Sequence, residues 1–267
     1  MSNLLKRSIP IILPLLVFAS FRILLEAPHW FYGVFIFLVF LSILSISHLT
    51  GKIKSQEKVN FLIAPLFFIL GSLIFFIFIE NRIFQYLFMI GAALMLAVQL
   101  ENIFIYFNHP YKEKISLAIQ SGVSNFFDFI TLFLFYSSFF SFRIFLNITL
   151  LSLIPLVFLI TILLVYENFW ANGIFRISEN VGGTTSESKS VSYILIIGIL
   201  LAEMFWVVNF LPLSFYTNAL LLTIVYYTVT SISKCYFKGE TESKVVKRYL
   251  VFGLFLIGLV LGTAKWK

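Results

Sequence analysis

The residues that could take part in a reaction or bind a ligand lie inside apolar segments. Each polar group in such a segment raises the free energy of inserting the segment into hydrocarbon. Asp128 lies near the middle of the apolar segment 116–140. Further polar residues recur around it at steps of three and four, which places them on one face of a helix: Ser121, Ser124, Asn125 and Thr131. An ionisable group inside hydrocarbon costs ~2.5–3.5 kcal/mol on insertion scales, so Asp128 is a candidate functional group.

This polar stripe has two interpretations. It is either a substrate or ion path with Asp128 as a charge or proton site, or a set of hydrogen bonds between helices. Such bonds contribute only ~0.6 kcal/mol per pair on average.

Glu203 is a second candidate, because it is an ionisable residue near the middle of the apolar segment 191–213. Trp206 lies three residues further on and shares its helical face, whereas Asn209 is rotated away from Glu203. The carboxyl group is predicted either to carry a proton or to remain protonated and hydrogen bonded to a neighbouring helix.

Two residue pairs have spacings typical of structural roles. Arg22 and Glu26 lie four apart near the end of the first apolar segment, where they can form an ion pair or anchor the helix at the interface. Gly258 and Gly262 form a Gly-x-x-x-Gly pattern, which allows a close helix approach inside the bundle or between copies of the chain.

Common catalytic patterns are absent from the sequence. There is no Gly-x-x-x-x-Gly-Lys-Ser/Thr loop, no His-Glu-x-x-His and no Gly-x-Ser-x-Gly. Asn125 and Asp128 lack the further aspartates of a metal–diphosphate site. The three histidines and Cys235 are far apart in sequence. We therefore expect neither a metal nor a cofactor, and the sequence favours a protein that is not an enzyme.

The segments that must position these residues are continuously apolar. The chain is 60% hydrophobic and 12% charged, with a mean hydropathy of +1.01, and its charged share is half the usual ~25%. A helix spans the bilayer with ~20 apolar residues, whereas open strands would leave backbone groups unpaired. The sequence therefore predicts an all-α, polytopic transmembrane helical bundle. Its nine expected spans are 9–25, 30–47, 61–79, 83–107, 116–140, 144–166, 191–213, 214–233 and 249–264.

Polar breaks divide these spans. External turns are expected at Glu80–Arg82 and Ser141–Arg143, and Pro212 is expected to separate the seventh span from the eighth. The segment 167–190 has the composition of a flexible linker near its end. It is expected to join a six-helix region, 1–166, to a three-helix region, 191–267, within one bundle.

Lysine and arginine alternate between the two sets of loops. Fourteen lie on the side that includes the N-terminus and four on the opposite side. By the positive-inside rule the N-terminus is cytoplasmic and the C-terminus external. The net charge of +7 is spread over the loops, so we expect no nucleic acid partner. Expected partners are membrane lipids, and either a second copy of the chain or a membrane subunit.

The C-terminal quarter also carries a resemblance. The stretch Glu203-Met-Phe-Trp-Val-Val-Asn-Phe-Leu-Pro-Leu-Ser214, with Tyr226-Tyr227 and Val245-Val-Lys-Arg-Tyr249, resembles uncharacterised polytopic membrane proteins of candidate-phylum bacteria. The resemblance implies a location in the bacterial cytoplasmic membrane and implies no activity.

Three functions are compatible with these features. The sequence favours a transport or permease-type component whose fifth and seventh helices line the path. The alternatives are a membrane enzyme acting on a lipid-linked substrate, and a structural or assembly subunit without a catalytic site. Transport requires Asp128 and Glu203 to face one water-accessible cavity, whereas side chains that are packed away or face lipid favour assembly.

Overall fold

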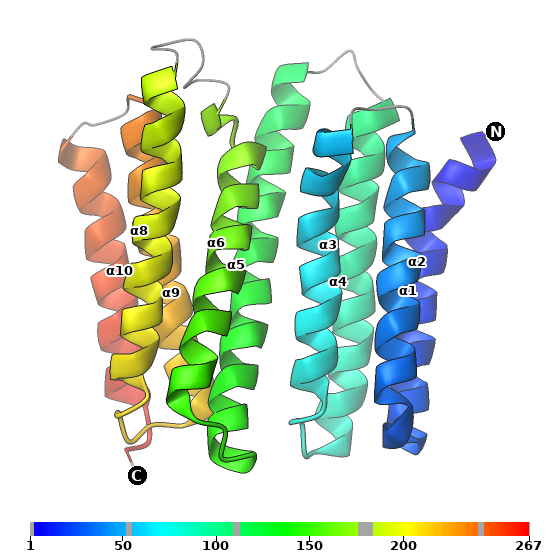
Figure 1. Cartoon of the computed structure of the whole chain (residues 1–267), viewed down its shortest axis with the longest axis horizontal. Coiled ribbons are helices and arrows are strands. Elements are labelled where there is room, and N and C mark those ends of the chain that lie inside the picture. The colour runs from blue at the N-terminus through cyan, green and yellow to red at the C-terminus, as the bar shows by residue number, and fades with distance from the viewer. Residues whose placement is uncertain (1–2, 52–54, 109–112, 176–183, 240–242, 267) are drawn as a thin grey trace. The chain divides into compact units, whose positions relative to one another are not determined.

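A computed structural model describes residues 3–51, 55–108, 113–175, 184–239 and 243–266 (Figure 1). Within these residues the regular structure is helical, without strands. Nine of the described helices are long and apolar enough to cross a membrane. The helices are α1 (Asn3–Glu26), the 3₁₀ turn η1 (Pro28–Trp30), α2 (Phe31–Thr50), α3 (Ser55–Phe76), α4 (Arg82–Asn108), α5 (Glu113–Phe145), α6 (Leu150–Ala171), α8 (Thr184–Val208), α9 (Phe215–Phe237) and α10 (Ser243–Thr263). The expected all-α fold with nine spans is thereby confirmed.

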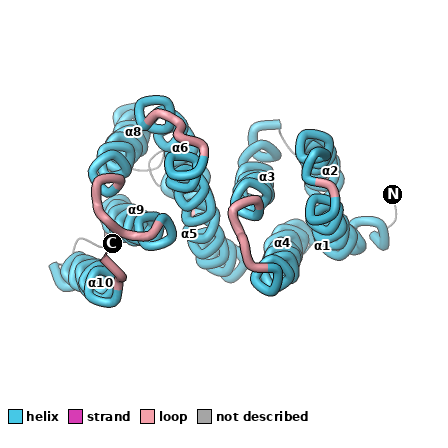
Figure 2. Tube along the Cα trace, turned by 90° about the horizontal axis from the view of Figure 1, so that it is seen from below, coloured by secondary structure: helices cyan, strands magenta, loops and turns pink. Residues whose placement is uncertain are grey.

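Packing contacts divide the chain into two compact units, Met1–Thr131 and Leu132–Lys267, so that α5 contributes to both. In the first unit α1 packs on α2 and α4, and α3 packs on α2 and α4. Figure 2 shows these four helices end-on. Aromatic rings fill part of the core, and the ring centroids of Phe21 and Phe76 lie 4.8 Å apart.

The second unit is built as a succession of helix pairs. α6 packs on α8, α8 on α9, and α9 on α10. The second half of α5 joins them through a hydrogen bond between the hydroxyl oxygens of Tyr136 and Thr161, 2.8 Å apart. A ring contact between Phe140 and Phe205, with centroids 4.5 Å apart, adds α8 to the same core.

Two glycines allow close approaches between helices of this unit. A Cβ atom at Gly198 of α8 would lie 2.7 Å from Cγ1 of Ile162 on α6. A Cβ atom at Gly253 of α10 would lie 2.3 Å from Oγ1 of Thr228 on α9. Real Cβ atoms do not approach other heavy atoms so closely, so both helix pairs depend on the missing side chain.

Several boundaries differ from those expected. The predicted turn at Ser141–Arg143 is wrong, because α5 continues to Phe145. The hydroxyl of Ser141 donates to the carbonyl oxygen of Ser137 at 2.8 Å, so it is satisfied inside the helix and does not end it. The chain turns afterwards, where Asn147 has a φ of 50°.

The segment expected as a loop over 167–190 is shorter than predicted, because α6 reaches Ala171 and α8 begins at Thr184. Residues 176–183 lie outside the described part. The break at Pro212 is confirmed, since α8 ends at Val208 and α9 begins at Phe215. The expected turn before Arg82 is also present, between α3 and α4.

Candidate functional site

The polar stripe of α5 is packed away inside the protein. Asp128 is 1% exposed and Thr131 is 1% exposed. The hydroxyl of Ser124 donates to Oδ2 of Asp128 over 3.5 Å, one helical turn away, which is a long hydrogen bond. Asn125 is half-buried, and the side chain of Ser121 lies outside the described residues. In the described part of the stripe, Ser124, Asp128 and Thr131 are therefore buried and Asn125 is half-buried.

Next to the stripe, α5 packs through aromatic rings. The rings of Phe127 on α5 and Phe68 on α3 meet edge to face with centroids 5.8 Å apart. Both residues are 2% exposed. Asp128 thus follows directly after a residue of the apolar core, and its burial accords with a carboxyl group that hydrogen bonds within the bundle.

Glu203 differs from Asp128 because it is exposed. It lines a groove of about 390 Å³ on the outside of the second unit, formed by α6 and α8. The other lining residues are apolar: Ile154, Pro155, Phe158, Ile199, Ala202 and Trp206. Trp206 shares the groove with Glu203, as their spacing predicts. The expectation that Glu203 hydrogen bonds to a neighbouring helix is not met, since it forms no hydrogen bond or ion pair with the described residues.

The depth of Glu203 follows from the helix that carries it. It precedes the end of α8 at Val208 by five residues, or about 7.5 Å along the helix axis. A hydrocarbon core is ~30 Å thick, so in a bilayer with one boundary at the end of α8 the carboxyl group would lie about midway between that boundary and the centre. Asn209 is the first residue after α8 and is half-buried. It begins the turn that leads to α9.

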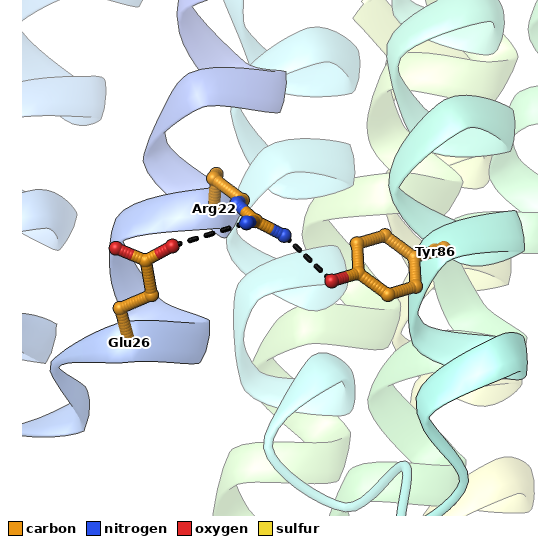
Figure 3. Close-up of polar contacts among 3 residues, drawn as sticks. All are labelled: Arg22, Glu26 and Tyr86. Carbon is orange, nitrogen blue, oxygen red and sulfur yellow. Dashed lines mark hydrogen bonds and ion pairs between the residues drawn. The ribbon is translucent and has the colours of Figure 1, made fainter.

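The pair at the end of the first apolar helix lies at the surface of the first unit (Figure 3). One guanidinium nitrogen of Arg22 lies 3.2 Å from a carboxylate oxygen of Glu26. Another donates a hydrogen bond of 2.6 Å to the hydroxyl of Tyr86 on α4. The Arg22 and Glu26 side chains are 49% and 68% exposed, so this cluster is an exposed link between α1 and α4.

Gly258 and Gly262 do not mediate close packing among the described helices. A Cβ atom at either position would meet nothing within 4 Å. The close approach on α10 occurs instead at Gly253, one turn and a residue earlier. The Gly-x-x-x-Gly face of α10 is open, and its packing between copies of the chain stays a prediction.

One group of buried polar residues was not predicted from the sequence. Glu167 and Asn168 on α6, Ser190 on α8 and Lys234 on α9 are all buried. They lie at one end of the second unit, where the ring of Phe237 contacts both Phe169 and Tyr193. Their polarity predicts loops at these positions, whereas the structure places them on helices. The signal that could have found them is helical spacing, since Asn168 follows the buried Thr161 by seven residues.

The described residues contain no group of three or more His, Cys, Asp or Glu side chains placed to hold a metal ion. Of the two carboxyl groups singled out by the sequence, Asp128 is buried and Glu203 is exposed. Asp128 is not among the residues that line the groove at Glu203.

Comparison with known proteins gives a family and no activity. Neither the curated proteins nor the solved structures contain a significant match to the chain. A family model described as a protein of unknown function, DUF5656, matches residues 41–263. This match extends far beyond the C-terminal quarter that carried the resemblance in the sequence. Since it covers well over half of the chain, the protein belongs to the DUF5656 family of proteins of unknown function.

Proposed function

We propose that the chain is a membrane-embedded assembly subunit that binds the transmembrane helix of a partner protein along the groove between α6 and α8. The observation that carries this proposal is Glu203, an exposed carboxyl group among apolar groove residues. Such a group costs ~2.5–3.5 kcal/mol in hydrocarbon. A partner helix that offers a lysine, an arginine or a hydrogen-bond donor at the depth of Glu203 would offset this cost.

Other occupants fit the groove less well. Lipid acyl chains offer no polar group at this depth. A second copy packed through the same groove would form a two-fold interface, which repeats each residue on both sides. That interface would bring two Glu203 carboxyl groups together, and like charges repel. A partner helix with a basic or donor side chain avoids this conflict.

Transport, which the sequence favours, has weaker support. A path requires polar groups around a water-accessible cavity, and the stripe that includes Asp128 is buried. An enzyme acting on a lipid-linked substrate would need several polar groups converging on a lateral opening. The groove at Glu203 has one ionisable group and otherwise apolar walls.

We further propose that the N-terminus faces the cytoplasm of a bacterial cell, with the whole chain in the cytoplasmic membrane. The excess of lysine and arginine on the side of the N-terminus supports the orientation. The resemblance of residues 203–249 supports the bacterial membrane. In this orientation Glu203 lies nearer to the external boundary.

The proposal can be tested with designed helices as partners. The purified protein is reconstituted in phosphatidylcholine vesicles with a polyleucine helix that carries one lysine about 7 Å from its external end. Energy transfer between dyes on the peptide and on an N-terminal tag of the protein measures association. An interhelical polar contact in membranes contributes ~1–2 kcal/mol in peptide systems. We therefore expect the lysine helix to bind roughly 5- to 30-fold more tightly than an all-leucine helix.

Variants assign this preference to the carboxyl group. Glu203→Leu should abolish the preference, whereas Glu203→Gln should keep part of it. Glu101→Leu is the matched control, because Glu101 is also exposed on a spanning helix, α4, and does not line the groove. Equal binding of both peptides, or an equal loss in Glu101→Leu, would contradict the proposal. Self-association of the protein that depends on Glu203 would assign the groove to a second copy instead.

A further inference from the structure

A second groove in the Leu132–Lys267 unit combines a polar rim with an apolar floor. It has a volume of about 540 Å³ and is lined by α5, the start of α9 and the end of α10. The rim contains Ser214, Tyr216, Thr217, Thr263 and Lys265. The floor contains Phe133, Leu220, Leu259 and Val260. Its size falls within the ~300–1,000 Å³ that is typical of small-molecule sites.

The helix register explains why the polar residues gather at one level. The close approach of Gly253 to Thr228 fixes how α10 lies along α9. Lys265 is twelve residues after Gly253, and Tyr216 is twelve residues before Thr228. Because the two helices run in opposite directions, Lys265 and Tyr216 lie at the same level. This level is where α9 begins and α10 ends, the boundary between hydrocarbon and water.

The rim offers donors for an anion. The hydroxyl oxygens of Ser214 and Thr217 lie 2.8 Å apart, and the Ser214 oxygen also accepts from the Thr217 backbone N–H at 3.2 Å. One hydroxyl proton makes the bond between the two side chains, which leaves the second proton available to a ligand. Lys265 is exposed and adds a positive charge, and none of the described lining residues is acidic.

We infer that this groove binds an anionic glycerophospholipid. Its phosphate group would lie at the Ser214–Thr217 hydroxyl pair and Lys265, with an acyl chain along Phe133, Leu220 and Leu259. The surrounding surface supports a lipid occupant, because α10 is only 6% buried over its apolar stretch. Trp266 is 57% exposed beside the rim, as is common for tryptophan at the interface. The inference does not depend on the partner helix proposed at Glu203.

The preference for an anionic lipid can be measured at Trp266. In a variant with the other three tryptophans changed to phenylalanine, brominated phosphatidylglycerol or brominated phosphatidylcholine is titrated into phosphatidylcholine vesicles that contain the protein. Quenching of Trp266 fluorescence gives the relative binding constant. One basic side chain near anionic lipid supports a preference for phosphatidylglycerol of about fivefold. We expect this preference to weaken at high salt, because the rim is exposed.

Variants separate the groove from general attraction to the membrane surface. Lys265→Gln and Thr217→Val should each reduce the preference, and together they should bring it close to one. Lys238→Gln is the matched control, since Lys238 is an exposed lysine at the other end of α9 and should leave the preference intact. Inorganic phosphate at millimolar concentration should not displace the lipid.

Three results would overturn the inference. The first is equal quenching of Trp266 fluorescence by both brominated lipids in the protein whose rim is unmodified. The second is an unchanged preference in the Lys265→Gln, Thr217→Val double variant, or an equal loss in Lys238→Gln. The third is full displacement by inorganic phosphate, which would show that the rim binds a free anion and that the apolar floor contributes nothing.

Discussion

Replacing Gly198 with alanine should separate α6 from α8 and destabilise the second unit. The new Cβ atom would lie 2.7 Å from Cγ1 of Ile162 and 3.1 Å from the nearest ring carbon of Phe158. The first distance is too short for any real contact, so a side chain or a helix must move. Overpacking of this kind typically costs ~1–3 kcal/mol.

A matched control isolates this cost. Alanine is favoured over glycine inside a helix by ~1 kcal/mol, and this gain occurs at any helical glycine. Gly258→Ala provides the same gain without a clash, because a Cβ atom there meets nothing within 4 Å. The difference in unfolding free energy between the Gly198→Ala and Gly258→Ala variants should therefore equal the overpacking cost, about 1–3 kcal/mol.

Unfolding of the detergent-solubilised protein by sodium dodecyl sulfate, followed by circular dichroism, measures these free energies. Ile162→Ala removes the atom nearest to the new Cβ, so it should restore part of the stability lost in Gly198→Ala. The double variant should thus be more stable than the two single effects predict. If Gly198→Ala is as stable as Gly258→Ala, or if Ile162→Ala brings no recovery, the proposed close packing of α6 on α8 is wrong.

Other parts of the structure give further predictions. Gly253→Ala should widen the distance between spin labels on α9 and α10, because the Cβ would lie 2.3 Å from Thr228 Oγ1; an unchanged distance would count against this contact. Tyr136→Phe should lower the unfolding free energy by ~0.6 kcal/mol and by no more than ~1.7 kcal/mol, and by much less when Thr161 is already valine. A reporter fused after Lys267 should be active outside the cytoplasm, and cytoplasmic activity would refute the orientation.

The sequence predicted which segments become helices, because a long and continuously apolar segment can cross a bilayer only as a helix. The nine predicted runs of apolar residues correspond to nine helices, among the described residues, that are long and apolar enough to span a membrane. Pro212 lies in the break between α8 and α9, which divides a run that is too long for one span, and proline removes a backbone hydrogen bond that a continuous helix would need. These features depend on local composition and on the thickness of the membrane.

The ends of helices were harder to predict, because a serine or threonine can satisfy its hydroxyl group inside a helix. Ser138 and Ser141 donate to backbone carbonyls four residues earlier, at 2.7 and 2.8 Å. Polarity alone therefore placed a turn at Ser141–Arg143, where the helix in fact continues. Because polar residues were expected to mark the ends of helices, Glu167 and Lys234 were also placed in loops. Both are in fact buried near the ends of helices that are longer than expected.

Whether the side chain of Glu203 is exposed or covered by another helix could not be predicted from the sequence. A helix that is apolar on all sides has no contrast between a buried face and a face toward lipid. The sequence showed that Glu203 and Trp206 share a face. Which face another helix covers depends on tertiary packing. Here α6 approaches α8 at Gly198, and Glu203 is left exposed in the groove beside this contact. The stripe on α5 was more predictable, because its polar residues contrast with the apolar remainder.

The most direct test of this account is the environment of residues 203 and 128 in a lipid bilayer. Cysteines are introduced one at a time in a Cys235→Ser background and spin labelled, and collisions with oxygen and with a water-soluble nickel complex are measured. Our account predicts that a label at 203 meets oxygen and little nickel, as a residue facing lipid does, and that a label at 128 meets neither. High nickel accessibility at both positions would show that both residues are open to water, as transport requires, and would contradict this prediction.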